Sequence, residues 1–449
     1  LMYILCTIKH TYMSQMNSKL KTTKNNTKME SKLIYDVKGK VNNVEKSYNE
    51  MTDDEIKELM NTERFSLTCA PGGENNRGME IIGRMPIKGE GFTAKDIEGL
   101  GPYFKDKVEV WINENGLMPV TVLDLNKLSD HKTIIDLKDD DQARVLILRD
   151  YISNWHGGQD SDIEIYKELA SKRWDAEYLD PNKYRTEIKD GKEVKVRGKR
   201  MNKRARTNLC FVPDREQEPA VFEGKGTIYD LKKMNFLNAA VERLRNDIAN
   251  GLIEIGSKTK VVINVVEGNR YYNLKTTGIG FHGDTERVVV ICLSIGGSNY
   301  PMRWQWFHDG MPAGNEIDIT LNSGDVYIMS EKAVGADWKK KSLWTLRHAA
   351  GANKYRSLSK WEKRWPAYNA RVQAKAQKNV EYAVSLIFKS KEKADKKAEK
   401  IKIKVKKKKD KKVAMDKTLK KKSIKLLEWA QKNGYTLKDI VAELEKQIE

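Results

Sequence analysis

The sequence predicts a mixed α+β protein with a barrel or jelly roll of short strands at its centre. Between residues 261 and 361, short stretches rich in β-branched and aromatic residues recur at regular spacing, with Gly, Asn and Pro between them. No helical repeat interrupts this run, although helical patterns lie on both sides of it. Such strands are typical of closed or double-sheet β architectures. The expected strands are 261–266, 278–282, 288–295, 304–307, 316–321, 326–329, 343–348 and 355–361.

Elements outside this run are predicted from helix caps and apolar stripes. Thr52 and Glu55 form a capping box that starts a helix ending near Met60. Apolar runs at 120–123 and 144–148 predict strands. A helix over 230–253 would buttress the strands with one apolar stripe, made of Leu231, Met234, Leu237, Val241, Leu244 and Ile248. Near the end, Asn433-Gly434 separates two expected helices, 424–432 and 436–448.

These patterns divide the 449 residues into five segments, and the length suits two or three folded domains. We expect residues 1–50, rich in Lys, Asn, Thr and Ser, to be disordered. Residues 51–190 are expected to form a separate α/β or α+β domain, and 191–365 the strand-rich domain. Residues 366–422 would be a basic helical linker of low complexity. Residues 423–449 would form a small helical hairpin, available to a protein partner.

Cysteine usage indicates a reducing, intracellular compartment. The four cysteines, Cys6, Cys69, Cys210 and Cys292, show neither CxxC pairing nor zinc spacing, so we interpret them as isolated thiols. The apolar start, residues 1–8, is too short to span a membrane and lacks the pattern of a signal peptide. We therefore expect no membrane partner. Met13 and Met16 are alternative starts of translation.

The net charge of +20 is concentrated in two stretches. Residues 389–422 contain 18 Lys and five acidic residues, and residues 192–206 contain eight basic residues and one acidic residue. Localised positive charge indicates a polyanionic partner, because each phosphate that is neutralised releases counterions. We expect nucleic acid to bind through both stretches. The alternative for the tail is a solvated Lys-rich segment or a nuclear-import signal at 406–409, which would imply a nuclear or nucleoid-associated location.

His282-Gly283-Asp284 and the distant His348 have the composition of a metal site. Two imidazoles and one carboxylate on one face of Fe(II) leave coordination positions open for a co-substrate and for oxygen. In a barrel or jelly roll, strands distant in sequence meet at one mouth, so these residues can converge. Each residue alone has an ordinary alternative, as a strand histidine or a turn aspartate. Together they predict a metal centre.

The segment 203–361 resembles the Fe(II)/2-oxoglutarate-dependent dioxygenases, and within them the AlkB-like branch. Asn269-Arg270-Tyr271 is similar to the family's Asn-x-Tyr pair, which hydrogen-bonds 2-oxoglutarate, with Tyr272 as the alternative tyrosine. The run 294–296 resembles the family's S-x-G strand end. Gly324-Asp325 resembles the Gly-Asp that opens the strand leading toward the distal histidine.

This resemblance implies a double-stranded β-helix (jelly-roll) core in which His282, Asp284 and His348 bind Fe(II). It further implies 2-oxoglutarate and O2 as co-substrates. Arg356 would pair with the distal carboxylate of 2-oxoglutarate, because the planar guanidinium grips a carboxylate with two parallel hydrogen bonds.

The resemblance also assigns a substrate-binding segment. Lys203, Arg204 and Arg206 stand where AlkB-like enzymes place a basic segment and a nucleotide-recognition lid. Residues 331–342 lengthen the chain relative to the AlkB pattern, and we expect them to form a loop over the mouth of the site.

The arginine pattern departs from the AlkB-like branch. That branch carries two arginines six positions apart, well after the distal histidine. Here Arg356 follows His348 by only eight residues, and Glu362 stands at the six-residue offset. An arginine this close to the histidine is more similar to the prolyl-hydroxylase branch, so the substrate class stays open.

The sequence therefore predicts an Fe(II)/2-oxoglutarate-dependent dioxygenase that demethylates or hydroxylates nucleobases in DNA or RNA, as DNA repair requires. A protein hydroxylase of the prolyl or lysyl type is one alternative, with the basic tail used for targeting. A hydroxylase of thymine or 5-methylcytosine is another. The non-enzymatic alternative is a nucleic-acid-binding protein with an inactive oxygenase domain.

Overall fold

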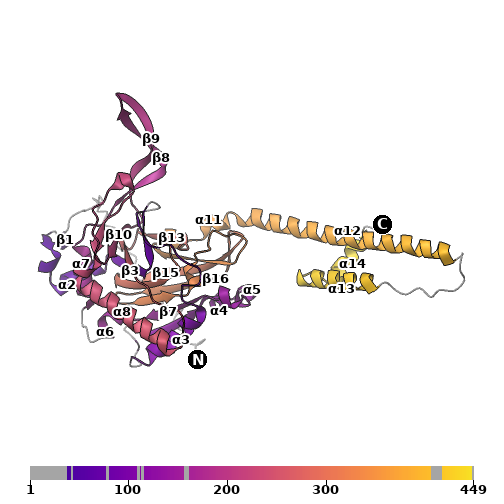
Figure 1. The fold of residues 1–449 in the computed structure, drawn as a ribbon, viewed down its shortest axis with the longest axis horizontal. Helices are drawn as coiled ribbons and strands as arrows, with labels where there is room; N and C mark the ends of the chain where they lie inside the picture. Colours follow the sequence, from indigo (N-terminus) through magenta and orange to yellow (C-terminus); the bar gives the residue numbers. More distant parts are fainter. Residues whose placement is uncertain are drawn as a thin grey trace, which may run out of the picture.

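A computed structural model describes residues 38–41, 44–76, 80–108, 112, 116–155, 161–405 and 417–446. Figure 1 shows a core of sheets and helices from which a β-hairpin arm and one long helix project. The expected α+β class is confirmed. Residues 1–37, which include Cys6, Met13 and Met16, lie outside the described residues, as do 406–416 of the basic tail.

The largest sheet has eight strands, and all of its pairings are antiparallel except that between β10 and β11. In spatial order these are β11 (Ile228–Asp230), β10 (Thr207–Val212), β12 (Val265–Tyr271), β3 (Arg64–Ala70), β14 (Val290–Gly296), β17 (Val326–Met329), β7 (Arg144–Leu148) and β6 (Val120–Asp124).

A second, antiparallel sheet has four strands and faces the first. In spatial order these are β13 (Gly278–His282), β18 (Thr345–Gly351), β15 (Tyr300–His308) and β16 (Met311–Leu321). From β12 to β18 the chain passes repeatedly between the two sheets, so strands distant in sequence become neighbours. This crossing brings the ends of β13 and β18 together.

Each face of the eight-stranded sheet is buried by a different layer. On β14, Ile291 and Leu293 pack into a core shared with the helices, while Val290 and Cys292 pack into the core between the two sheets. This period of two follows from the alternation of side chains along a strand. Because both faces are covered, β7 is buried along its whole length and apolar from Val145 to Leu148.

Helices cover the outer face of the large sheet. The predicted buttress is present as α8 (Asn235–Glu254), and its apolar stripe lies in the core as expected. The capping box of Thr52 starts α2 (Asp53–Met60) as predicted. The other helices at this end of the chain are α3 (Ala94–Lys105), α4 (Leu125–Leu128), α5 (Lys132–Ile135), α6 (Tyr151–Asn154) and α7 (Ser161–Ala170).

Short elements complete the core. These are β1 (Lys38–Val41), β2 (Val44–Ser47), β4 (Gly72–Asn76), β5 (Glu80–Gly83) and α9 (Glu331–Val334), with single turns of 3-10 helix at η1 (Tyr48–Glu50), η2 (Asp139–Asp141), η3 (Val221–Glu223) and η4 (Leu231–Lys233). The expectation of disorder up to residue 50 is therefore wrong for 38–41 and 44–50. There the β1–β2 hairpin and the buried Tyr48 order the chain.

The expectation of a separate domain over 51–190 is also wrong. This segment contributes β3, β6 and β7 to the same sheet as β12, β14 and β17. In particular, β3 lies between β12 and β14 and pairs with both. The strand-rich region after residue 191 therefore cannot close its own sheet, and the two segments form one folding unit.

The expected strand over 355–361 is replaced by two short helices, α10 (Asn353–Arg356) and α11 (Ser359–Glu362). The place next to β12 and β14 that a further strand would take is already occupied by β3. The chain after β18 therefore turns away, aided by Gly351, whose φ of +91° suits glycine.

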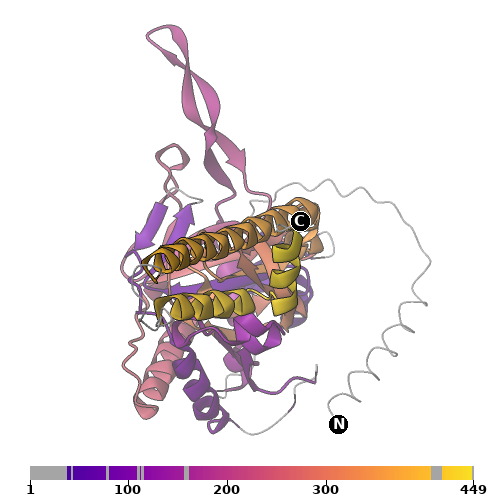
Figure 2. The same cartoon turned by 90° about the vertical axis from the view of Figure 1, so that its right-hand side faces the viewer.

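The arm consists of β8 (Glu177–Lys189) and β9 (Lys192–Asn202) and stands clear of the core (Figures 1 and 2). Asp190 and Gly191, both with positive φ, form its tip. Such a pair suits the two-residue turn of a β-hairpin. The basic stretch 192–206 is thus mainly one strand of this arm.

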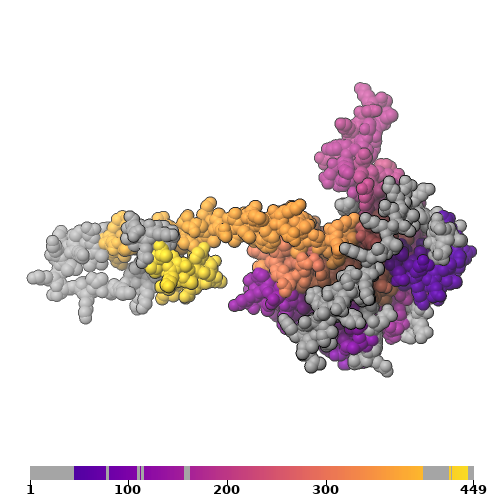
Figure 3. All heavy atoms as spheres, turned by 180° about the vertical axis from the view of Figure 1, so that it is seen from behind, coloured from indigo at the N-terminus to yellow at the C-terminus, as the bar shows by residue number. Residues whose placement is uncertain are grey.

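The C-terminal region is helical, as predicted. Helix α12 (Trp365–Val405) projects from the core, and α13 (Lys417–Lys432) and α14 (Leu437–Lys446) pack against it (Figures 1 and 3). Gly434, with φ of +80°, separates α13 from α14 at the expected stop. Within the described residues, no helix combines the length and apolar character that crossing a membrane requires.

We expect Leu67→Ala to lower the free energy of unfolding by about 2–5 kcal/mol, because Leu67 on β3 is fully buried. Urea unfolding followed by tryptophan fluorescence measures this, since Trp304 and Trp306 lie in the core between the sheets. The control is Ile188→Ala on the arm, where the side chain is 76% exposed and a change within about 0.5 kcal/mol is expected. A transition that Leu67→Ala leaves unmoved would contradict the placement of β3.

Candidate metal centre

The three predicted ligand residues converge at one end of the four-stranded sheet. His282 ends β13 and pairs in register with His348 on β18, and Asp284 follows two residues later. The distance from Asp284 Oδ1 to His282 Nε2 is 3.4 Å, and to His348 Nε2 it is 3.8 Å. All three ligand atoms lie within 4.8 Å of one another.

These atoms could hold a divalent metal ion. Ligands about 2.1 Å from an ion, on adjacent corners of an octahedron, lie about 3 Å apart. The two separations from Asp284, 3.4 and 3.8 Å, are larger than this by about 0.4 and 0.8 Å, so the side chains would move inward on binding an ion. Two imidazoles and one carboxylate on one face leave the opposite corners free for other ligands.

The protonation states suit metal binding. His282 Nδ1 lies 2.8 Å from the carbonyl oxygen of Gly280 and 3.1 Å from that of His348, so Nδ1 carries the proton and Nε2 presents its lone pair. Burial, together with the nearby charge of Arg206, lowers the pKa of His282 to about 4. Burial also lowers the pKa of His348 well below its usual value. Both imidazoles are neutral at pH 7.

A buried set of charges orients Asp284. Arg287 Nε lies 3.6 Å from Asp284 Oδ2, and the same guanidinium pairs with Glu267 and with Glu286. The backbone N–H of Asp284 donates to the carbonyl oxygen of Val334 at 3.2 Å. Burial raises the pKa of Asp284 to about 7, although Arg287 acts to lower it.

The triad opens into a pocket of about 210 Å³ between the two sheets. This volume suits a small molecule. Strand β3 contributes Arg64, Ser66 and Thr68 to one wall, because alternate residues of a strand share a face. The opposite residues on β12, which are Tyr271, Asn269 and Glu267 by register, line the same pocket.

Arg64 is a buried cation inside this pocket. Its guanidinium donates to Ser66 Oγ at 3.4 Å, to the carbonyl oxygen of Leu321 at 3.4 Å and to Ser294 Oγ. It also lies over the ring of Tyr300, 4.7 Å from the centroid. Among the described residues no carboxylate forms an ion pair with it. An uncompensated buried charge is costly. The hydroxyl of Tyr300 is also buried, and no residue that the structure describes hydrogen-bonds to it.

Arg356, the residue expected to bind the distal carboxylate, does not line the pocket. It lies on α10, where Nε donates to the carbonyl oxygen of Gly351 at 2.8 Å and a terminal nitrogen donates to Asn353 Oδ1 at 2.6 Å. Its position follows from the replacement of the expected strand by α10. Three other arginines, Arg64, Arg206 and Arg287, line the pocket, and of these Arg64 comes from β3, more than 200 residues before the triad.

The predicted Asn-x-Tyr pair does line the pocket. Asn269 donates to Glu267 Oε1 at 2.9 Å and accepts from Arg206 Nε at 2.6 Å. Tyr271 is buried, and burial raises its pKa to about 12. Tyr272, the alternative tyrosine, instead donates to the carbonyl oxygen of Arg204 outside the pocket.

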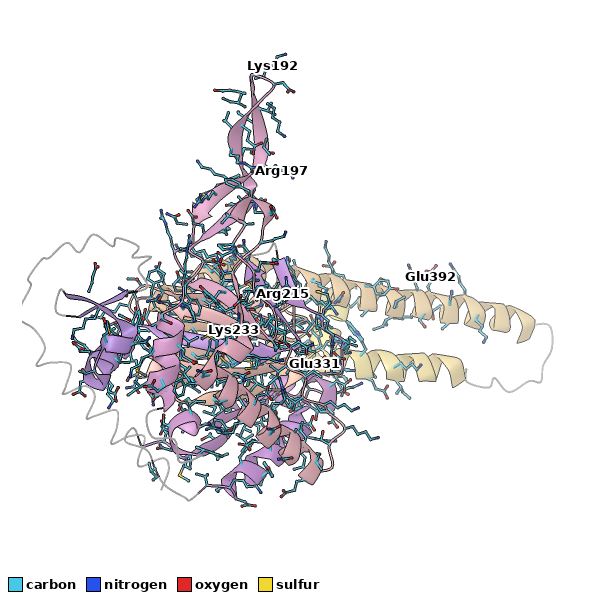
Figure 4. All side chains as sticks on the ribbon, turned by 60° about the vertical axis from the view of Figure 1, so that its left-hand side comes forward. Lys192, Arg197, Arg215, Lys233, Glu331 and Glu392 are labelled. Carbon is cyan, nitrogen blue, oxygen red and sulfur yellow. The ribbon has the colours of Figure 1, made fainter. Side chains whose placement is uncertain are left out.

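The three residues expected to bind substrate lie in different environments. Arg206 lines the pocket, Arg204 is exposed, and Lys203 is only 6% exposed and donates to Asn208 Oδ1. Lys203 therefore cannot reach an external substrate. Lys192 marks the tip of the arm, far from the core (Figure 4), so residues 192–202 do not form a lid over the pocket.

The insertion 331–342 lies beside the site, as expected of a loop near its mouth. It contains α9 and a turn at Gly335, and Trp338 lines the metal pocket. A side chain at Gly283 would place its Cβ 2.0 Å from the Gly335 carbonyl oxygen. Glycine at position 283 therefore lets the insertion pack directly between two of the ligands.

Sequence reasoning missed Arg64, Tyr300 and the Glu267–Arg287 pair. None of them belongs to a short motif. Arg64 and Glu267 reach the pocket through the pairing of β3 with β12, whereas Arg287 follows Asp284 by three residues. One usable signal was the position of Arg64 at the start of an apolar stretch, 65–70, because a charge beside a buried strand needs a partner.

No family model matches the chain. The chain is 33% identical over 293 residues to a protein of Acanthamoeba polyphaga mimivirus named "Uncharacterized protein R156". The match covers 65% of this chain and 97% of the mimivirus protein. The chain therefore belongs to the same family as that mimivirus protein.

The pH dependence of stability tests whether Lys203 is buried. Burial lowers its pKa to about 8, against 10.5 in the unfolded chain, so the unfolded chain binds more protons between these values. We expect the free energy of unfolding of the wild type to rise between about pH 8 and 10.5, relative to Lys203→Met, by on the order of 3 kcal/mol. Chemical denaturation of both proteins across this range measures it. Parallel pH profiles would show that Lys203 is solvated.

Proposed function

We propose that this protein is an Fe(II)- and 2-oxoglutarate-dependent dioxygenase that acts on a nucleobase. The observation that carries the proposal is the shared pocket, in which two neutral imidazoles and a carboxylate lie beside a buried arginine that has no ion-pair partner among the described residues. A metal-binding face next to an unsatisfied cation suits a ligand that chelates a metal and carries a second carboxylate.

The strand order supports a double-stranded β-helix as the finer description of the core. Strands β13, β15, β16 and β18 form one sheet, and β12, β14 and β17 lie in the other, with β3 between β12 and β14. We propose that β3 supplies the strand that usually follows the distal histidine. In this proposal the carboxylate-binding arginine comes from the beginning of the domain, so Arg64 takes the role expected of Arg356.

Iron bound by His282, Asp284 and His348 would supply oxygen activation coupled to the decarboxylation of 2-oxoglutarate. The guanidinium of Arg64 would hold the distal carboxylate of 2-oxoglutarate, and the unpartnered hydroxyl of Tyr300 would donate to the same group. Asn269, on the neighbouring strand of the same wall, would help to position the co-substrate.

Two other residues of the pocket would orient a metal ligand and exclude water. Arg287 holds the Asp284 carboxylate in place through their contact at 3.6 Å. Trp338 would close the mouth and limit access of water. A target base would have to leave its stack to reach the buried ligands, of which His348 is 7% exposed.

The test is succinate formation from 2-oxoglutarate in the presence of Fe(II), oxygen and methylated single-stranded oligonucleotides. We expect turnover in the wild type, and an increase of on the order of 100-fold in the KM for 2-oxoglutarate in Arg64→Met, because that variant removes one partner of a buried charge pair. Arg64→Lys should recover part of the loss, since it restores the charge without the planar fork.

Arg356→Met is the matched control and should leave the KM unchanged, because Arg356 bonds only outside the pocket. Thermal unfolding of each variant confirms that the fold is retained. The proposal fails if the wild type forms no succinate with any oligonucleotide. Normal kinetics in Arg64→Met, with a raised KM in Arg356→Met, would instead show that Arg356 binds the distal carboxylate of 2-oxoglutarate.

A further inference from the structure

A second cleft, of about 670 Å³, lies beside the metal pocket. Its walls come from the turn between β15 and β16, the insertion after α9, strand β18, helix α11 and the beginning of α12. Six basic residues line it, together with one carboxylate, that of Asp309. The basic residues are Lys339, Lys341, Arg347, Lys360, Arg364 and Arg371.

Most of this positive charge has no counter-charge among the residues that the structure describes. Asp309 pairs with Arg371, and within the described part of the chain the other five basic residues form no ion pair. Burial and the nearby charges of Arg347 and Arg364 lower the pKa of Lys360, as expected where like charges crowd together. An anion in the cleft would relieve this repulsion.

Two buried donors in the cleft lack acceptors. Arg347 Nε and Trp338 Nε1 are inaccessible to solvent and have no hydrogen-bond partner among the described residues. The Arg347 guanidinium is fixed over the Phe307 ring, 4.0 Å from its centroid, and donates to the Trp338 carbonyl oxygen at 3.2 Å. The charged guanidinium is therefore held rigidly in the wall of the cleft.

Aromatic side chains alternate with these charges. Trp338 and Tyr368 are half-buried, so each ring keeps an accessible part. Trp361 is buried beneath them, where Nε1 donates to the carbonyl oxygen of Gly310 at 3.1 Å and fixes α11 against the turn between β15 and β16. Basic side chains beside accessible rings are the combination that single-stranded nucleic acids bind.

The cleft and the metal pocket share a wall. Trp338 lines both of them, and its Cβ lies close to Gly283, between two of the metal ligands. Arg347 precedes His348 on β18, so on this strand the charge of the cleft and a ligand are adjacent in sequence. A chain bound in the cleft would pass the mouth of the pocket.

We propose that this cleft binds the phosphate backbone of a single-stranded nucleic acid and delivers one base past Trp338 to the metal pocket. This proposal names the class of substrate. The reaction of that base at the metal pocket rests on the proposed function. Phosphates match the excess of positive charge in the cleft, and bases match the accessible rings. A duplex suits the cleft less well, because its bases are stacked and cannot reach the rings.

The test uses the full-length protein without iron or 2-oxoglutarate. Fluorescence anisotropy compares labelled single-stranded DNA and RNA of one sequence, the corresponding duplex and a polyglutamate peptide. We expect the single strands to bind most tightly. The double variant Lys341→Glu/Arg364→Glu should weaken that binding about tenfold and reduce the slope of log K against log salt by about 1.4, because each phosphate contact with a single strand contributes about 0.7.

The matched control is Lys258→Glu/Lys260→Glu in the loop after α8, where both side chains are exposed and the change in charge is the same. It should leave the affinity within about twofold, since long-range charge effects are screened by salt. Equal weakening by both double variants, or by neither, would overturn the proposal. So would tighter binding of the duplex, or polyglutamate binding as tight as that of the strands, which would indicate an acidic peptide.

The two proposals can fail separately. Anisotropy measures strand binding and does not depend on turnover. Succinate formation in the absence of nucleic acid measures turnover and does not depend on the cleft. We expect the Lys341→Glu/Arg364→Glu variant to keep its uncoupled 2-oxoglutarate turnover while it loses strand binding. Loss of both in a folded variant would show that the substitutions disturb the metal pocket, and would contradict a separate strand-binding cleft.

Discussion

The pairing of β3 with β12 on one side and β14 on the other is the constraint on which the rest of the structure depends. The register sets Arg64 opposite Tyr271 and opposite Gly296, so one strand from the beginning of the chain completes both the sheet and the wall of the pocket. Its other face buries Phe65 and Leu67 against the helices. Without β3, the strands β12 and β14 would each lose one pairing partner, and the pocket would lose Arg64.

Charge burial sets the character of the site. Glu267, 4% exposed, accepts from Arg287, from Asn269 and from the backbone N–H of Glu74 at 2.8 Å. Buried charges stabilise a fold only when their partners are present and well placed. This network therefore fixes Asp284 before any ligand arrives. Arg64 contrasts with it, because its guanidinium is equally buried but meets only hydroxyl and carbonyl oxygens and an aromatic ring.

Local signals predicted the elements that depend on local chemistry. The capping box of Thr52, the strand Val326–Met329 and the helix that buttresses the sheet are all where the sequence indicates, and His282, Asp284 and His348 do converge. Pairing between distant strands leaves no such local signal, so the role of β3 was not predictable. The arm was missed for a different reason. Its strands carry few buried apolar residues, and only the Asp190-Gly191 turn indicated a hairpin.

The most direct measurement is an anaerobic titration of the Fe(II)-loaded protein with 2-oxoglutarate, followed by visible absorption. If His282, Asp284 and His348 hold iron next to a carboxylate-binding Arg64, a charge-transfer band should grow to saturation in the wild type. It should be absent in His348→Ala and require far more 2-oxoglutarate in Arg64→Met. His308→Ala, which removes a histidine outside the cluster, should behave as the wild type does. No band in the wild type, or the same band in His348→Ala, would contradict the metal centre.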